Sequence, residues 1–254
     1  MKIYGKFISL ALPAILIVTT FSGCSNSKVL IKKDDTLMNE ANNHYARDQF
    51  LEANEKYQKL VDEFPDSRHR KLSILGIADS LFKQNKFFEA ALFYGRFKEL
   101  YPMDYLAPKA LFYQAMCHYN DTSTYDRNQS SAQKAVNIFN EFIKEYPDHL
   151  LKPYAEEKKA KMISLMRESE MSIIRFYHRT NRNQSAIMRI SEFLEKNPYS
   201  KHIPEVLFIL GDSYVHEQAY KKAAKAYMEI IEKYPNSMHY KLAIQMAKKL
   251  KLKN

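Results

Sequence analysis

The stretch from Leu207 to Pro235, which reads LFILGDSYVHEQAYKKAAKAYMEIIEKYP, decides the fold because its pattern recurs along the chain. It holds an alanine, an aromatic residue four positions later and a proline twelve positions after the alanine. The five instances are Ala53-Tyr57-Pro65, Ala90-Tyr94-Pro102, Ala135-Phe139-Pro147, Ala186-Ile190-Pro198 and Ala223-Tyr227-Pro235, and only Ile190 departs from the aromatic position. Successive prolines lie 37, 45, 51 and 37 residues apart, so one structural unit is expected to occur five times.

Each member of the triple has a physical role in a helical hairpin. The alanine lets two helices approach closely, the aromatic residue one turn later fills the gap, and the proline ends the helix. This pattern, at a period near 34 residues, is typical of tetratricopeptide (TPR) repeats. The expected fold is therefore all-α: a TPR-like helix-turn-helix solenoid of five repeats plus a C-terminal closing helix.

The same pattern sets the expected boundaries. The solenoid should occupy residues 35–254, with N-terminal repeats over 35–149 and C-terminal repeats over 150–254. The expected helix pairs are 35–48 with 50–64, 68–84 with 86–101, 106–119 with 130–146, 153–180 with 182–197, and 203–218 with 220–234, followed by 238–251. The polar residues 120–129 should form an inserted loop, and 153–180 one unusually long helix.

Composition supports this assignment. Hydrophobic residues make up 46% of the 254 positions, which is enough for a buried interior and argues against disorder. Only five glycines occur, too few for a many-turned β protein or for glycine-rich phosphate loops. The net charge is +10, but acids and bases alternate along the expected helices, which indicates solvated faces and no nucleic-acid partner.

The first 23 residues have the layout of a signal peptide. Lys2 and Lys6 precede an apolar run over 7–21, and Ser22-Gly23-Cys24 follows. A transmembrane anchor is the alternative, but the run is shorter than the roughly 20 residues that span a bilayer. The segment 21–24 resembles the bacterial lipobox, although Phe21 stands where leucine is usual. The resemblance implies that Cys24 carries lipid, that 24–34 is a lipidated tether, and that the chain is sorted to the outer membrane.

Catalytic and cofactor motifs are missing from the sequence. It contains no His-Glu-x-x-His, Gly-x-Ser-x-Gly or Walker pattern, so we expect no enzyme, no cofactor and no metal. An enzyme acting on the cell wall remains the alternative from another class of protein. Cys117 lies in an apolar stretch and is expected to be a packed core thiol.

The first helix of each TPR pair lines a concave surface, which suggests where a ligand could lie. Nine residues of the first three repeats are expected there: Met38, Asn42, Tyr45, Leu75, Asp79, Phe82, Phe112, Met116 and Tyr119. Such a trough suits extended peptides with apolar or aromatic side chains. The alternative, left open for each residue, is that it packs against a neighbouring helix.

Taken together, the lipobox, tether, five repeats and closing helix resemble the BamD family, lipoproteins of the outer-membrane β-barrel assembly machinery. The resemblance implies a position on the periplasmic face of the outer membrane. Implied partners are the central barrel subunit, companion lipoproteins and unfolded outer-membrane proteins, the last received by the N-terminal repeats. Arg189 matches an arginine that the family uses to bind the barrel subunit. The alternative is another periplasmic TPR scaffold that coordinates envelope synthesis or division.

Overall fold

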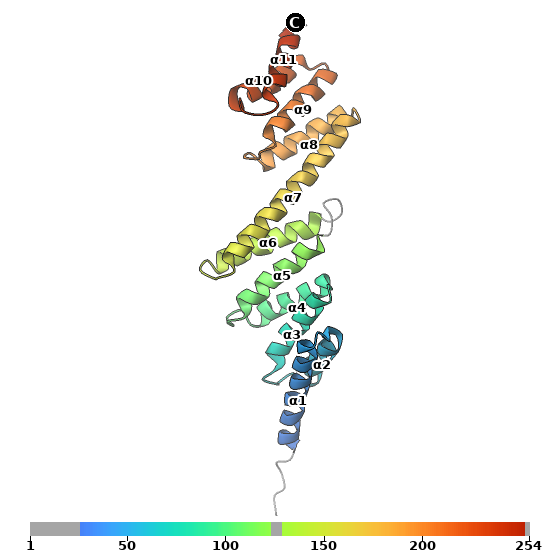
Figure 1. Cartoon of the computed structure of the whole chain (residues 1–254), viewed down its shortest axis with the longest axis vertical. Helices are drawn as coiled ribbons and strands as arrows, with labels where there is room; N and C mark the ends of the chain where they lie inside the picture. The colour runs from blue at the N-terminus through green and yellow to red at the C-terminus, as the bar shows by residue number, and fades with distance from the viewer. Residues whose placement is uncertain (1–25, 123–128, 252–254) are drawn as a thin grey trace, which may run out of the picture.

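The computed structural model describes residues 26–122 and 129–251, and this part of the chain is built from eleven helices. They are α1 (Asn26–Ala46), α2 (Phe50–Glu63), α3 (Arg70–Lys83), α4 (Phe87–Leu100), α5 (Ala107–Asp121), α6 (Gln129–Glu145), α7 (Lys152–Arg179), α8 (Asn183–Lys196), α9 (Ile203–His216), α10 (Tyr220–Lys233) and α11 (Tyr240–Lys251). Each helix packs against the next one in the chain, and the pairs stack into an elongated array (Figure 1). The all-α TPR-like solenoid is confirmed.

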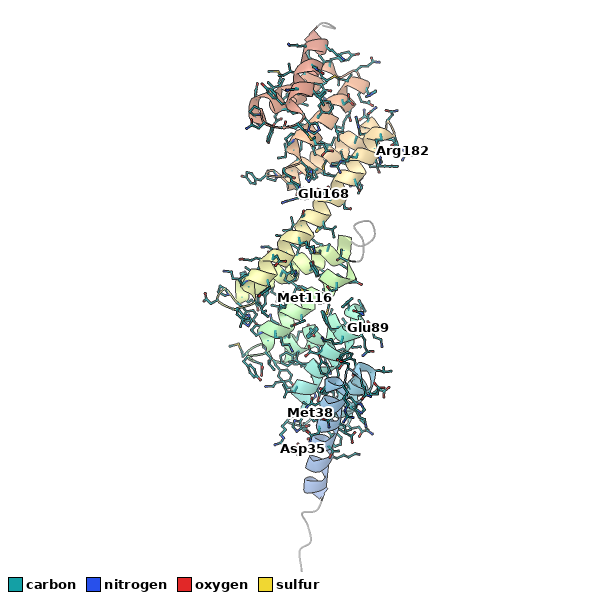
Figure 2. The ribbon with its side chains drawn as sticks, in the orientation of Figure 1. Asp35, Met38, Glu89, Met116, Glu168 and Arg182 are labelled. Atoms are coloured by element: carbon teal, nitrogen blue, oxygen red, sulfur yellow. The ribbon has the colours of Figure 1, made fainter. Side chains whose placement is uncertain are left out.

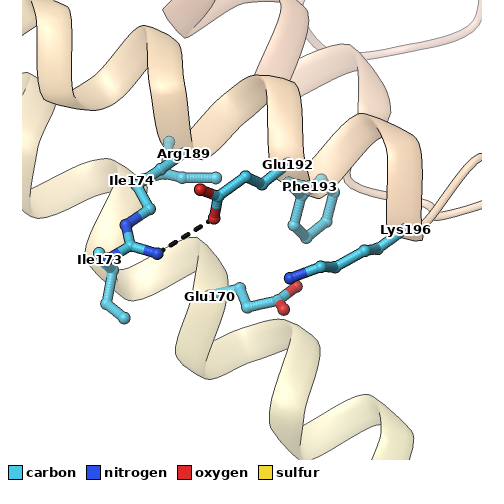
Figure 3. Close-up of a pocket in the computed structure, with 7 residues that line it drawn as sticks. All are labelled: Glu170, Ile173, Ile174, Arg189, Glu192, Phe193 and Lys196. Carbon is cyan, nitrogen blue, oxygen red and sulfur yellow. Dashed lines mark hydrogen bonds and ion pairs between the residues drawn. The ribbon is translucent and has the colours of Figure 1, made fainter.

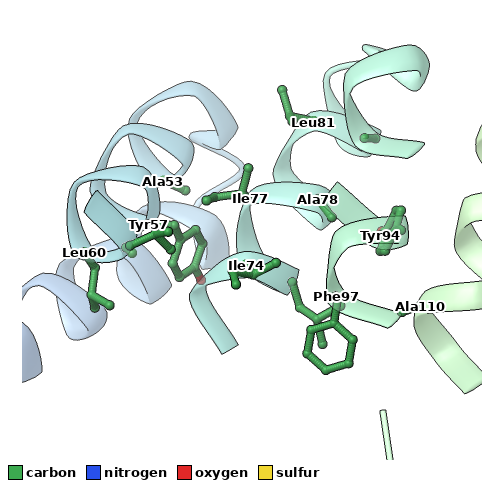
Figure 4. Packing of buried hydrophobic residues seen from close by; sticks show 14 of the residues in the cluster. Ala53, Tyr57, Leu60, Ile74, Ile77, Ala78, Leu81, Tyr94, Phe97 and Ala110 are labelled. Atoms are coloured by element: carbon green, nitrogen blue, oxygen red, sulfur yellow. The ribbon is translucent and has the colours of Figure 1, made fainter. Parts of the chain in front are cut away.

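The alanine and aromatic positions of the repeat form the interior, as their spacing predicts. All five alanines of the triple have no exposed surface, and the residue four positions later is at most 4% exposed in every repeat. Figure 4 shows this packing in the first two repeats, where Tyr57 and Tyr94 lie among the aliphatic side chains of neighbouring helices. The repeats therefore share a core that continues from one to the next.

Close helix approach is clearest at Gly211 of α9. A Cβ atom at this position would lie 2.6 Å from the ring of Tyr227 on α10. Gly76 of α3 meets the ring of Tyr57 on α2 at the same distance. In both places the ring occupies the space that a side chain would need, so glycine is required by packing.

The turns within the repeats have a common backbone feature. Asp48, Asn85, Asn181 and Gln218 have φ between 54° and 59°, in the left-handed region. Each lies between the two helices of a pair, in repeats one, two, four and five. Asparagine and aspartate tolerate this region better than other side chains, whereas Gln218 adopts it without that advantage.

Three expectations about boundaries need correction or fall outside the described residues. Helix α1 begins at Asn26 and not near residue 35, because the segment 26–34 contains no proline or glycine to stop a helix. Most of the expected tether 24–34 is therefore helical. The expected insert 120–129 lies mainly outside the described residues, with α5 continuing to Asp121. The signal peptide and Cys24 also lie outside them.

The expected long helix is present as α7, which has 28 residues and crosses the array diagonally (Figure 1). Its first half contributes Ala155 and Met162 to a core cluster shared with α5 and α6. Its second half contributes Met171 and Ile174 to a cluster shared with α8 and α9. Helix α7 thus belongs to both halves of the solenoid.

Candidate functional site

Three aromatic rings occupy equivalent positions on the first helices of the first three repeats. Tyr45, Phe82 and Tyr119 are each 37 residues apart, near the ends of α1, α3 and α5, and all three are half-buried. We call this set the aromatic row. Figure 2 shows the order of these helices along the molecule, with Met38 of α1 farther toward the N-terminal end than Met116 of α5. Each of the first three repeats thus has one partly accessible ring at this position of its first helix.

The first two rings of the row pack against other aromatic side chains. Tyr45 contacts Phe50 edge-on at 5.3 Å between ring centroids, and Phe82 contacts Phe87 at 5.4 Å and Tyr113 at 5.6 Å. Edge-on contacts of this kind fix the orientation of a ring. Tyr45 and Phe82 are therefore held in orientation by their aromatic neighbours.

Asp79 lies beside the row but makes structural contacts. It accepts hydrogen bonds from the Tyr94 hydroxyl within its own repeat and from Lys109 Nζ of the next repeat, the latter at 2.9 Å. Burial and the neighbouring Asp79 carboxylate raise the pKa of Tyr94 far above its usual range. Asn42 accepts the equivalent hydrogen bond in the first repeat, where the Tyr57 hydroxyl donates to its Oδ1 at 2.6 Å.

Phe112 corrects the expected set, because it is only 7% exposed and does not line a surface. Its ring packs between Phe139 and Phe142 of α6, at 6.0 and 5.7 Å. The equivalent residues Met38 and Leu75 are also buried. Phe112 thus faces the second helix of its own repeat, whereas Met116 is partly buried and lies at the margin of the same core cluster.

The sequence reasoning missed Tyr113 and Lys109. Tyr113 stacks on Tyr94 at 5.8 Å and touches Phe82 edge-on, so it joins the second and third repeats beneath the aromatic row. Lys109 Nζ lies 5.7 Å from the centroid of the Tyr113 ring. The sequence did contain a signal for Tyr113. It directly follows Phe112, so its side chain lies about 100° farther round the helix than that buried ring.

A second candidate site surrounds Arg189 on α8. Arg189, Glu192, Phe193 and Lys196 of α8 enclose a hollow of about 110 Å³ together with Glu170 and two isoleucines of α7. In Figure 3 the Arg189 guanidinium points toward Glu192, and Lys196 and Glu170 point toward one another. The Arg189–Glu192 pair measures 3.1 Å, and both side chains are more than 40% exposed. The arginine is therefore accessible to a partner.

Ion pairs join α7 to α9 in the C-terminal half. Arg175 donates from Nε and Nη2 to the two carboxylate oxygens of Glu205, at 2.6 and 2.8 Å. This two-pronged bond holds the pKa of Glu205 below its usual value. His202 Nε2 lies 2.9 Å from Glu168, and His178 Nε2 lies 2.7 Å from Asp212. These pairs align the end of the long helix with the last repeats.

The cysteine, histidine and acidic side chains of the described residues are the other groups that could react or hold a metal ion. Cys117 is 1% exposed, and burial raises the pKa of its thiol to about 12, so the expected core thiol is confirmed. Among residues 26–122 and 129–251, no three His, Cys, Asp or Glu side chains are grouped so as to hold a metal ion. Within the same ranges, no helix combines the length and apolar character needed to cross a membrane.

The chain is similar to several known proteins. The chain is 23% identical to the outer membrane protein assembly factor BamD of Caulobacter vibrioides, over 85% of this chain and 72% of that protein. It is 26% identical to BamD of Rickettsia prowazekii, over 93% of this chain and 96% of that protein. Among solved structures, the TPR2AB-domain:pHSP90 complex of yeast Sti1 aligns with 14% identity and a TM-score of 0.44, over 87% of this chain and 84% of that chain.

Two family models also match the sequence. A tetratricopeptide repeat model matches residues 205–237, which contain the triple of the fifth repeat. A second model, described as YfiO, outer membrane lipoprotein, matches residues 32–218 and so covers most of the solenoid. The chain belongs to the YfiO family of outer membrane lipoproteins.

Proposed function

We propose that this protein is a lipid-anchored scaffold subunit of the outer-membrane β-barrel assembly machinery, without catalytic activity of its own. The observation that carries the proposal is the family membership over residues 32–218. The relatives named outer membrane protein assembly factor BamD point to the same process. The anchor would be Cys24, and the solenoid would face the periplasm.

The N-terminal repeats are proposed to receive extended segments of unfolded outer-membrane proteins. Such segments alternate apolar and polar side chains, and the apolar ones need a partly desolvated surface. Tyr45, Phe82 and Tyr119 offer one half-buried ring per repeat, which provides contact area at small entropic cost. Binding would bury ring surface that is already fixed in orientation.

The C-terminal repeats are proposed to bind the central barrel subunit through Arg189, with companion lipoproteins joining the assembly. The Arg189–Glu192 pair is exposed and separated by a single helical turn, and such pairs contribute only about 0–1 kcal/mol. Exchanging Glu192 for a carboxylate of the partner therefore costs little. The planar guanidinium can then form two parallel hydrogen bonds to that carboxylate, the geometry in which arginine binds a carboxylate most strongly.

The test is an affinity pull-down of the lipidated protein from detergent-solubilised membranes. Arg189→Glu should lose the barrel subunit, while Phe82→Ala should keep it and bind fewer unfolded outer-membrane proteins. Lys221→Glu, an exposed charge reversal on α10, is the matched control and should lose neither. Recovery of cell-wall synthases or division proteins in place of a barrel subunit would refute the assembly function and favour another envelope scaffold.

A further inference from the structure

The positive charge of the chain is concentrated at its C-terminal end. Residues 26–219 hold 28 basic and 27 acidic side chains, so this part is nearly neutral. Residues 220–251, which comprise α10, the following turn and α11, hold eight lysines and two glutamates, a net charge of +6. These two helices lie at the end of the elongated array opposite to α1 (Figure 1). The balance of acids and bases along the solenoid therefore ends at α9.

The lysines of α11 lie on its outer side. Lys241, Lys248 and Lys249 are exposed, and their spacing of seven and eight residues places them on one side of the helix. Ala243 and Leu250, on the opposite side, are buried against the fifth repeat. The helix has the sequence YKLAIQMAKKLK, which contains no acidic residue. We call the three exposed lysines the cationic face of α11.

Helix stability does not account for all of this charge. A cation is favourable in the last turn of a helix, where Lys248 and Lys249 lie, and unfavourable in the first turn. Lys241 lies in the first turn of α11 and Lys221 in the first turn of α10, and neither turn contains an acidic residue. Residues that oppose the local preference of their own helix indicate a use outside the fold.

The composition of this end favours a lipid surface over a protein partner. Protein interfaces are enriched in arginine, whose planar guanidinium fits a single carboxylate, and depleted in lysine. Residues 220–251 contain no arginine, whereas α7 contains three. Apolar side chains lie close to the lysines in the sequence, since Met238 is 86% exposed and Leu242 is 46% exposed. Flexible cations beside exposed apolar side chains are typical of surfaces that bind anionic lipids.

We propose that the cationic face of α11 binds an anionic membrane surface, with Lys221 and Lys225 of α10 adding to the attraction. The lysines contact lipid phosphates, and Met238 and Leu242 enter the interfacial layer. Binding weakens as salt is added, because the attraction falls off within about 10 Å at about 0.1 M salt. Together with the proposed lipid at Cys24, this attaches the solenoid at both ends, so that it lies along the membrane. Only this orientation rests on the proposed anchor.

The test uses the chain from residue 24 onward with Cys24→Ser, which keeps every described residue. Acyl chains at residue 24 would attach the protein to any vesicle and hide the effect of charge. Binding is measured by flotation with two kinds of vesicle, one of phosphatidylcholine and one that also contains about 30% phosphatidylglycerol. The solenoid should bind the anionic vesicles about tenfold or more tightly than the neutral ones, and about 0.5 M salt should remove the difference.

Variants of the solenoid locate the effect. Substituting glutamate for the three lysines of the cationic face should abolish the preference for anionic vesicles, and substituting glutamine should remove most of it. The matched control reverses three exposed lysines of the N-terminal repeats, Lys83, Lys86 and Lys144, and changes the net charge by the same amount. This control should keep the preference. Circular dichroism should give the same helix content for all variants, because every substituted lysine is exposed.

Each outcome supports or overturns the lipid surface. Equal binding of the two kinds of vesicle by the unsubstituted solenoid would overturn it. Equal loss of binding in the control variant would overturn it too, because the preference would then reflect net charge alone. If anionic vesicles are not bound but the glutamate variant loses an acidic protein in the pull-down, the cationic face is a protein interface. None of these outcomes involves Arg189 or the aromatic row, so the proposed function stands or falls separately.

Discussion

Substituting glycine by alanine should have opposite effects at two positions of this solenoid. At Gly211 the new Cβ would lie 2.6 Å from the ring of Tyr227, a side chain with no exposed surface. Ring and helix cannot separate without disturbing the core of the fifth repeat, and overpacking of this kind costs about 1–3 kcal/mol. Alanine returns at most about 1 kcal/mol through its higher helix propensity. The net loss expected for Gly211→Ala is about 1–2 kcal/mol.

Gly95 of α4 is the matched control. A Cβ there would lie 2.7 Å from Nε2 of Gln114, which is the free end of a flexible side chain and can move away. The helix-propensity gain should then dominate, so Gly95→Ala should stabilise the protein by up to about 1 kcal/mol. The two variants make the same chemical change in the same kind of helix, so they differ only in what the methyl group meets.

Thermal unfolding followed by circular dichroism can distinguish these effects. For a chain of this size 1 kcal/mol corresponds to about 2–4 °C, so Gly211→Ala should lower Tm by about 2–8 °C and Gly95→Ala should raise it slightly. Urea unfolding should give the same order of stabilities. If Gly211→Ala proves neutral or stabilising, the close approach of α9 and α10 does not constrain the fold and the packing argument is wrong.

Three further predictions concern other parts of the chain. Because Arg175 lowers the pKa of Glu205 below its usual 4.5, the pair stabilises the fold above that pH, and this contribution is lost as the pH falls through the lowered value. Glu205→Gln should therefore weaken the pH dependence of the unfolding free energy below pH 4.5. Gln218→Asn should raise stability by a few tenths of a kcal/mol, measured by urea unfolding, because asparagine tolerates φ near 56° better; a loss would contradict this. Buried and with its pKa raised to about 12, Cys117 should be alkylated by iodoacetamide at pH 8 only after urea is added, as read by peptide mass spectrometry; rapid labelling of folded protein would show that α5 opens.

The sequence was sufficient for the helices because each repeat carries its own local signals. Ala223, Tyr227 and Pro235 define one hairpin without reference to the rest of the chain, and the other four triples do the same. The start of α1 was predicted too late, since a lipid tether suggests an extended segment while the residues themselves contain no helix breaker. A boundary without a proline or glycine has no local marker in the sequence.

The candidate site was predicted less completely, since it depends on which side of each helix meets a neighbour. Spacing placed Phe112 and Tyr119 on one face, but the contact of α5 with α6 buries the first and leaves the second half-exposed. The contact of Lys158 and Lys161 with the ring of Tyr119 could not be predicted for another reason. The two lysines lie on a different repeat and approach that ring only through the packing of α7. Arg189 was identified by family resemblance, and the structure adds the acidic residue beside it.

The long helix α7 has a mechanical consequence. Its 28 residues make a rod about 42 Å long, whose two halves are embedded in different core clusters. Between the two embedded portions lie Arg167, Glu168 and Glu170, which are half-buried and bond to Asn197 or His202. A bend of about 10° there would move an end some 20 Å away by about 3.5 Å, roughly two-thirds of the pitch of one helical turn. The stiffness of this one helix therefore sets how far the aromatic row and the Arg189 hollow can move relative to each other.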